Sequence, residues 1–144
     1  MNYLFLTDEF YTRYNEKDYP EIERKSTRPY IMIKISINEL DFGLPLRSGI
    51  NHKYALWTDK PNHCGVDYSK AVLIPVAKYI DDTNPYVRPN EHSALKGKEF
   101  LLQKGFESYI EKYKKALKKR HIKACNDMCS FSTLQYYHTE LGIS

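Results

Sequence analysis

Residues 28–37 alternate between two kinds of side chain, and this pattern constrains the fold more than any other part of the chain. The stretch reads RPYIMIKISI and has isoleucine at every second position from Ile31 to Ile37. A period of two is typical of a strand that buries one of its faces. The pattern therefore predicts a half-buried strand over 28–37.

Three more apolar stretches follow this strand: FGLPL at 42–46, KYALWTD at 53–59 and AVLIPV at 71–76. The gap NELD at 38–41 is a turn, and the gap at 60–70 has the composition of a loop. Parallel neighbours would need crossover connections of about a dozen residues or more, usually helical, and these gaps are too short. We therefore expect an antiparallel sheet, in which Pro45 restricts its strand to an edge or a bulge.

Helical patterns lie at both ends of the chain. Thr7 can cap a short helix that has Asp8 and Glu9 in its first turn. From Lys98 to Arg120, apolar residues recur three and four positions apart, as on the buried face of a helix. A last helix is expected from the cap Ser132 to Leu141, with loops at 15–28 and 81–92. Strands followed by helices indicate an α+β fold, in which a twisted antiparallel sheet has helices on one side.

The size and composition of the chain are those of one globular domain spanning 1–144. Hydrophobic residues make up 42% and charged residues 28%, which is not a disordered composition. No apolar run approaches the roughly 18 residues of a membrane helix, and the N-terminus lacks the features of a signal peptide. Three cysteines form no disulfide pattern. We therefore expect a cytoplasmic protein with no membrane partner.

Positive charge is concentrated in one segment. Residues 96–123 contain ten Lys or Arg and three Glu, so this segment carries +7 and the remainder of the chain −3. A cationic element on a mildly acidic body suggests a polyanionic partner such as nucleic acid. A solvated, lysine-rich helix explains the same pattern about equally well.

Three kinds of functional site are disfavoured by the sequence. Cys125 and Cys129 lie four apart but lack a second pair of zinc-ligand spacing, since His63 and Cys64 are adjacent. Buried apolar cysteines are the preferred interpretation, and no metal or cofactor is expected. No nucleophile motif surrounds the serines or cysteines, and the six glycines match no nucleotide-binding loop.

The stretch LPLRSGINHKY (44–54) contains Arg47, Ser48, His52 and Lys53 just after a predicted strand. RNA cleavage by its own 2′-hydroxyl needs a base, a group that stabilises negative charge on phosphorus, and an acid. His52 is suited to proton transfer, Arg47 and Lys53 to holding phosphate, and Ser48 to donating a hydrogen bond. Taken alone, the stretch is explained more simply as a polar turn.

The chain also resembles a known family. RPYIMIKI, FGLPLRSGINHKYAL, GVDYSKAVLIP and CSFSTLQYYHTELGI are similar to segments of type III toxin–antitoxin toxins, the ToxN and AbiQ group, and particularly of its CptN and TenpN branches. The resemblance implies a metal-independent, sequence-selective endoribonuclease of bacterial cytoplasm that leaves 2′,3′-cyclic phosphate and 5′-hydroxyl ends. It implies neutralisation by a pseudoknotted RNA antitoxin in a cyclic complex. It also implies a strongly twisted sheet like that of the Kid and MazF toxins.

The resemblance, together with the chemistry of the residues, gives candidate site residues. Many members of the family read Pro-Leu-x-Ser-Pro-Lys at the active-site turn; Pro45, Leu46 and Ser48 match, whereas Gly49 replaces the second proline and the basic residue comes later. The candidate catalytic residues are Tyr11, Arg47, Ser48, His52 and Lys53. The candidate RNA-binding residues are Arg28, Tyr30, Lys34, Lys112, Lys115, Lys118, Lys119, Arg120 and His138. Two other functions stay open: a non-catalytic RNA-binding module that uses the helix at 98–120, and a protein-interaction domain.

Overall fold

The computed structural model describes residues 1–24 and 29–143. Within these ranges the chain forms the predicted α+β fold, with six strands and four α-helices. The strands are β1 (Tyr3–Leu4), β2 (Met32–Ile37), β3 (Leu40–Arg47), β4 (Ala55–Asp59), β5 (Cys64–Asp67) and β6 (Val72–Leu73). The helices are α1 (Asp8–Arg13), α2 (Pro89–Leu95), α3 (Glu99–Leu117) and α4 (Lys123–Phe131).

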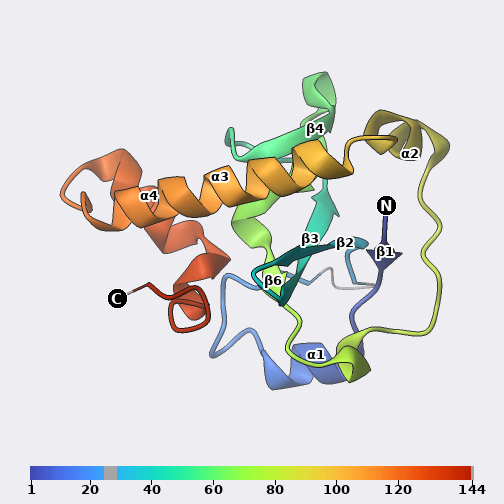
Figure 1. Cartoon of the computed structure of the whole chain (residues 1–144), viewed down its shortest axis with the longest axis horizontal. Helices are drawn as coiled ribbons and strands as arrows, with labels where there is room; N and C mark the ends of the chain where they lie inside the picture. The colour runs from blue at the N-terminus through green and yellow to red at the C-terminus, as the bar shows by residue number, and fades with distance from the viewer. Residues whose placement is uncertain (25–28, 144) are drawn as a thin grey trace.

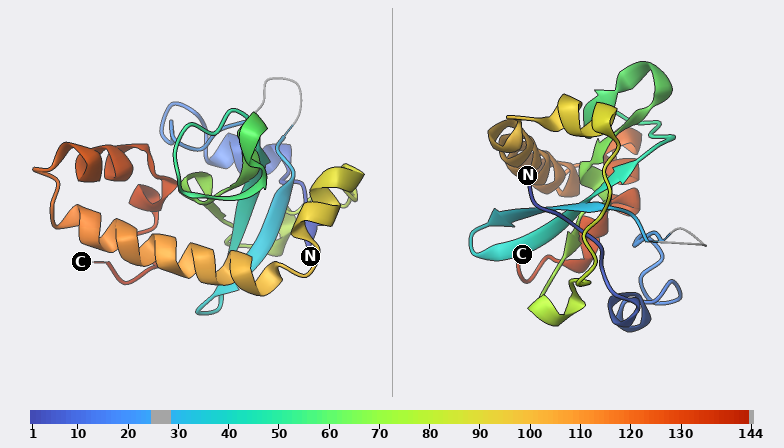
Figure 2. Two further views of the ribbon diagram at one scale, coloured as in Figure 1. Left: turned by 90° about the horizontal axis from the view of Figure 1, so that it is seen from above. Right: turned by 90° about the vertical axis from the view of Figure 1, so that its right-hand side faces the viewer.

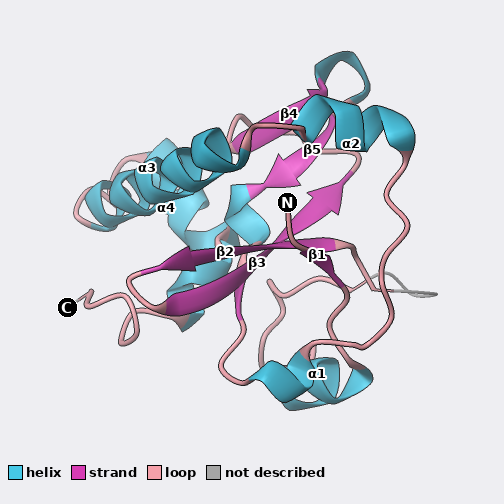
Figure 3. Ribbon diagram, turned by 45° about the vertical axis from the view of Figure 1, so that its right-hand side comes forward, coloured by secondary structure: helices cyan, strands magenta, loops and turns pink. Residues whose placement is uncertain are grey.

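The sheet has the order β1-β2-β3-β5-β4, with β6 paired to β3, and the described pairings are all antiparallel, as predicted. The hairpin between β2 and β3 turns at Asn38 and Glu39, whose φ angles are 49° and 67°. Two consecutive positive φ angles are typical of the tight turn whose twist suits a hairpin. The β4–β5 end of the sheet is rotated relative to the β1–β2 end (Figure 3).

Both faces of the sheet are covered, which corrects the expectation that helices lie on one side. Ile33, Ile35 and Ile37 pack in a core cluster with α3, as their alternation predicts. Met32 points the other way and joins a second cluster with Phe10 of α1. Figures 1 and 2 show α3 running along one side of the sheet and α1 lying on the other.

Helix α3 buries its predicted apolar face, with one exception in its first turn. Leu102 and Phe106 are fully buried, and Tyr109 and Tyr113 continue the buried face. Leu101, which belongs to the same run of apolar residues, is 56% exposed instead. Thr7 caps α1 as expected, because its hydroxyl accepts a hydrogen bond from the amide of Phe10 at 3.2 Å.

Three local predictions were wrong, and one helix was missed. Strand β5 lies in the predicted 60–70 loop, and α2 begins at the end of the predicted 81–92 loop. Helix α4 was not predicted. Ser132 does cap a helix, since its hydroxyl accepts from the amide of Leu134, but that helix is a short 3-10 turn over Thr133–Tyr136 and does not reach Leu141.

Pro45 lies in a central strand, not at an edge. The amide of Leu46 donates to the carbonyl of Ile31, just before β2, at 2.9 Å, so the nitrogen of the preceding residue faces away from β2. On that other side β3 changes partner, from β6 at Phe42 and Gly43 to β5 at Leu46 and Arg47. Pro45 therefore occupies the gap between two partners, where no amide is needed.

None of the helices in the described part of the chain is both long enough and apolar enough to cross a bilayer.

Candidate active site at the end of strand β3

The pairing of β3 with β5 brings Arg47 to Asp67. Arg47 lies opposite Gly65 in this register, so Asp67, two residues beyond Gly65, projects from the same face. The guanidinium Nη1 of Arg47 donates to Asp67 Oδ2 at 2.5 Å, and Nη2 lies 2.7 Å from Glu23 Oε2. The Arg47 side chain is 16% exposed and that of Asp67 is fully buried.

Asp67 is held ionised by its neighbours. Burial raises the pKa of this carboxyl group, but hydrogen bonds from His52 and Ser69 and the charge of Arg47 lower it, and the net pKa lies below its ordinary value. The hydroxyl and amide of Ser69 donate to Asp67 Oδ1 at 2.6 and 2.9 Å. The carboxylate thus organises one cation, one hydroxyl and one imidazole.

His52 reaches this cluster from the loop that follows β3. Ile50 anchors the loop, because it is 2% exposed and its amide donates to the carbonyl of His63 at 3.0 Å. The amide of Tyr54 donates to His52 Nδ1 at 3.0 Å, which places the proton of a neutral ring on Nε2. That Nε2 lies 3.2 Å from both Asp67 Oδ2 and Ser69 Oγ.

A pocket of about 620 Å³ opens beside this cluster, and its lining residues include Glu23, Arg47, His52 and Ser69. Lys70 lies in the same wall, where its ammonium group contacts Glu21 Oε1 at 2.9 Å and the carbonyl of Phe131 at 2.8 Å. Both cations of the wall, Arg47 and Lys70, are therefore paired with carboxylates. An anionic ligand would have to compete with Glu21 and Glu23 for them.

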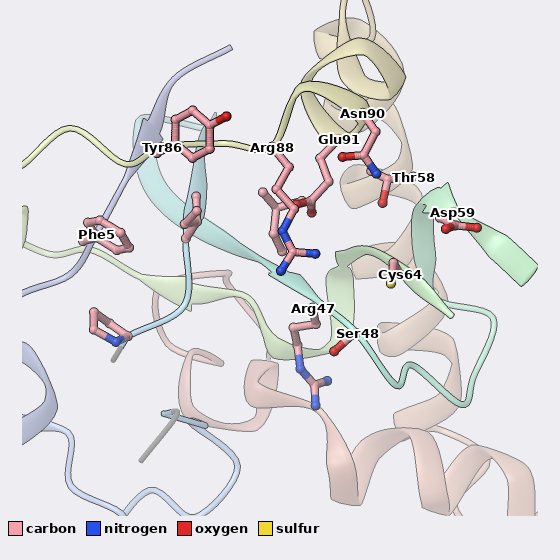
Figure 4. Close-up of a pocket in the computed structure, with 13 residues that line it drawn as sticks. Phe5, Arg47, Ser48, Thr58, Asp59, Cys64, Tyr86, Arg88, Asn90 and Glu91 are labelled. Carbon is pink, nitrogen blue, oxygen red and sulfur yellow. The ribbon is translucent and has the colours of Figure 1, made fainter. Parts of the chain in front are cut away.

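Ser48 faces a different pocket from His52. It is exposed and lines a second pocket of about 410 Å³, which Arg47 also lines (Figure 4). The next residue, Gly49, has a φ of +68°, a left-handed conformation that glycine adopts without strain. The turn therefore separates Ser48 from His52, and the two candidates face different pockets.

Lys53 and Tyr11 lie outside both pockets. Lys53 is exposed and its ammonium group lies 5.6 Å from the centre of the Tyr54 ring. Tyr11 is 7% exposed, packs edge-on against Phe10, and its hydroxyl has no hydrogen-bond partner among the described residues. Burial raises the pKa of this hydroxyl far above its ordinary value, so the group stays protonated.

The candidate RNA-binding residues fall into two groups, and Arg28 lies outside the described residues. Four candidates contact other side chains of the protein. The Tyr30 ring lies 5.8 Å from the guanidinium of Arg47, Lys34 lies 3.7 Å from Asp41, Arg120 donates to Asn126 at 2.9 Å, and His138 lies 2.6 Å from the Tyr113 hydroxyl. The others are exposed on or just after α3: Lys112, Lys115, Lys118 and Lys119. These four lysines, with the exposed Arg120, keep the predicted basic surface accessible.

Sequence reasoning assigned no role to Glu23, Asp67, Ser69 or Lys70. Three of them lie in GVDYSKAVLIP, a stretch that carries the family resemblance. That resemblance was the available signal, because an Asp-x-Ser-Lys sequence after a short strand has no specific meaning by itself. Only the pairing of β5 with β3 brings this stretch to the LPLRSGINHKY turn.

The three cysteines are free thiols, and no three His, Cys, Asp or Glu side chains gather as a metal site within residues 1–24 and 29–143. Cys129 is buried, as the apolar interpretation predicts, and Cys125 and Cys64 are half-buried.

In comparisons with known proteins, no protein-family model, curated protein or solved structure matches this chain.

Proposed function

We propose that this protein is the toxin of a type III toxin–antitoxin system, a metal-independent endoribonuclease that is inhibited by an RNA antitoxin. The observation that carries the proposal is that Glu23, Arg47 and His52 line one pocket, next to the turn that resembles the family's active site. Two of these three groups come from that turn. A twisted sheet of the ToxN kind is part of this proposal.

The three groups match the needs of cleavage by a 2′-hydroxyl. Glu23 accepts the 2′ proton as the oxygen attacks phosphorus, and Arg47 stabilises the charge on the non-bridging oxygens. The bond from phosphorus to the 5′ oxygen breaks, and that oxygen takes a proton from His52. The products are a 2′,3′-cyclic phosphate and a 5′-hydroxyl.

Asp67 and Ser69 act as positioning residues in this scheme. Asp67 holds Arg47 and His52 at once, and Ser69 completes the coordination of the carboxylate. Proton transfer by His52 requires its Nδ1 to lose the hydrogen bond from Tyr54, because both ring nitrogens are protonated in the acid form. The histidine therefore has to move during each cycle.

Phosphate binding at Arg47 also requires a rearrangement. Glu23 is 38% exposed on its side chain and occupies one edge of the guanidinium. A scissile phosphate that approaches Arg47 displaces Glu23 from this edge, which frees the carboxylate for the 2′-hydroxyl. Exchange of one anion for another at the arginine thus couples substrate binding to activation of the base.

Cleavage of single-stranded RNA by purified protein in EDTA tests the proposal. We expect fragments with 2′,3′-cyclic phosphate and 5′-hydroxyl ends, a loss of about 10²- to 10³-fold in rate for Arg47→Ala, and about 10²- to 10⁴-fold for His52→Ala. His52→Gln keeps a donor but cannot shuttle a proton, so it should be as slow as His52→Ala. Fragments that appear only with added magnesium would contradict the mechanism.

A non-catalytic RNA-binding module is the second candidate function. The four exposed lysines at 112, 115, 118 and 119 favour it, because they offer phosphate contacts without needing the pocket. Tight RNA binding by a wild-type protein that never cleaves would support this alternative.

A further inference from the structure

The second pocket, about 410 Å³ in volume, lies on the far side of the Arg47–Ser48 turn from His52. Strands β3, β4 and β5 supply part of its wall, and α2 with the segment before it supplies another part (Figure 4). Residues near β1 and just before β2 complete the lining. Arg47 lines both pockets, so a strand of RNA with its scissile phosphate at this turn would place a neighbouring nucleotide in each.

The lining of this pocket has the mixed character that a nucleobase requires. Tyr86, at the edge of the pocket, is 78% exposed, and Phe5 lies on the same side of the pocket (Figure 4). An exposed aromatic ring offers a face on which an unpaired base stacks. Leu46 also lines the pocket.

Polar groups line the other side of the pocket. Thr58 Oγ1 is buried and has no hydrogen-bond partner among the described residues, which is an unusual state for a buried hydroxyl. The Asn90 amide is drawn beside it, and Arg88 extends toward the Arg47–Ser48 turn (Figure 4). An amide and a hydroxyl can pair with the edge of a base, and an arginine can pair with a phosphate.

We infer that this pocket binds the unpaired base next to the scissile phosphate and sets the sequence preference of cleavage. The base stacks on Tyr86, its polar edge meets Asn90 and Thr58, and Arg88 holds the adjoining phosphate. This inference rests on the proposed endoribonuclease function, and it assigns base selection to residues outside the LPLRSGINHKY turn.

Cleavage of a randomised single-stranded RNA library, followed by sequencing of the 5′-hydroxyl ends, tests the inference. The wild-type protein should show a base preference at one position beside the cut. Asn90→Ala and Thr58→Val should weaken that preference, and Thr58→Ser, which keeps the hydroxyl, should retain it. Tyr86→Ala should lower kcat/KM by about 5- to 100-fold through loss of stacking. Phe100→Ala, an exposed aromatic of α3 outside the pocket, is the matched control and should change neither.

The outcomes separate the two proposals. A wild-type protein that cleaves with a preference unchanged by Asn90→Ala, Thr58→Val and Tyr86→Ala overturns the base-binding pocket and leaves the ribonuclease proposal standing. A wild-type protein that cleaves none of the library removes the ribonuclease proposal, and the pocket inference with it. Thermal melting of each variant confirms that a lost preference comes from a folded protein.

Discussion

At the scale of single residues, Asp67 determines how the candidate site is arranged. Its carboxylate is fully buried and is shared by Arg47, His52 and Ser69. Breaking a buried ion pair typically costs about 3–5 kcal/mol, and the cost here should lie at the lower end because Arg47 keeps Glu23 as a second carboxylate partner. We expect Asp67→Asn to lower the free energy of unfolding by about this amount, measured by urea denaturation at pH 7.

Ser69→Ala is the matched control for Asp67→Asn, because it removes one hydrogen bond from the carboxylate and no charge. Its cost should be closer to about 1 kcal/mol. Asp67 stabilises the fold above its ordinary pKa, and this contribution should fade as pH falls through its lowered pKa. A variant Asp67→Asn as stable as the wild type would show that the cluster does not support the fold.

Glu23 has two possible roles that one substitution distinguishes. If its carboxylate accepts the 2′ proton, Glu23→Gln should slow cleavage by about 10²-fold or more and alter the acidic limb of the pH–rate profile. We expect this result. Glu21→Gln is the matched control, because Glu21 contacts Lys70 rather than Arg47. Faster cleavage by Glu23→Gln would mean that the carboxylate only competes with the phosphate for Arg47.

At the scale of secondary-structure elements, strong patterns were predictive and short segments were not. The alternation at 31–37 and the apolar face of α3 were confirmed because both repeat over several turns or residue pairs. Strand β5 is four residues long and contains a glycine, so it is a strand only because β3 and β4 pair with it on both sides. Such pairing is a tertiary effect that local sequence does not encode.

Helices α2 and α4 lacked the capping signals on which helix prediction relies. Neither has a side chain that caps its first turn. Pro89 at the start of α2 was one available signal, since proline favours the first position of a helix. Cys125, Met128 and Cys129 in α4 are spaced three and four apart toward the core, a pattern that three residues are too few to establish.

Gly105 in α3 gives an element-scale prediction. Exposed glycines in helices are usually improved by alanine, which gains about 1 kcal/mol. Here a Cβ atom at position 105 would lie 2.0 Å from the hydroxyl of Tyr68, whose ring stacks near Phe106 and Tyr109. We therefore expect Gly105→Ala to lower the free energy of unfolding by about 1–3 kcal/mol, measured by urea denaturation.

The double variant Gly105→Ala with Tyr68→Phe removes the clashing oxygen and serves as the control. It should regain part of the lost stability. If Gly105→Ala alone is more stable than the wild type, the Tyr68 ring has room to move away from α3, and the close contact between Gly105 and Tyr68 does not limit the packing of α3 on the sheet.

The basic surface of α3 predicts a salt effect. Lys112, Lys115 and Lys119 are exposed, and each phosphate contact they make with RNA would release counterions. Reversing all three to glutamate should weaken RNA binding and flatten the slope of log affinity against log salt. Reversal of Lys78, which lies beyond β6 and pairs with Glu9, is the control. An unchanged slope would mean that the α3 lysines are simply solvated.

At the scale of the whole molecule, the candidate site forms where separate parts of the chain meet. Glu23 precedes β2, Arg47 ends β3, His52 follows it and Asp67 ends β5. The sequence located the Arg47 and His52 turn because its chemistry is local. It could not supply Asp67, whose contribution depends on the pairing of β5 with β3, or Glu23, whose contribution depends on how the segment before β2 packs against the site.

The abundance of tyrosine leads to a prediction about pH. Several of the thirteen tyrosines pack in the core, where Tyr68 is 6% exposed. Burial raises the pKa of Tyr68 from 10.0 to about 12. Between these values the unfolded chain loses the phenol proton while the folded protein keeps it, so the free energy of unfolding falls as pH rises. This one group should account for about 2–3 kcal/mol of the loss.

Urea denaturation at a series of pH values from 8 to about 12 tests this prediction. Tyr68→Phe lacks the titrating hydroxyl, so its stability should fall less steeply above pH 10 than that of the wild type. Tyr86→Phe is the matched control, because it removes the same hydroxyl from an exposed ring. If both variants follow the wild-type curve, the Tyr68 hydroxyl reaches water in the folded protein and α3 does not seal that side of the core.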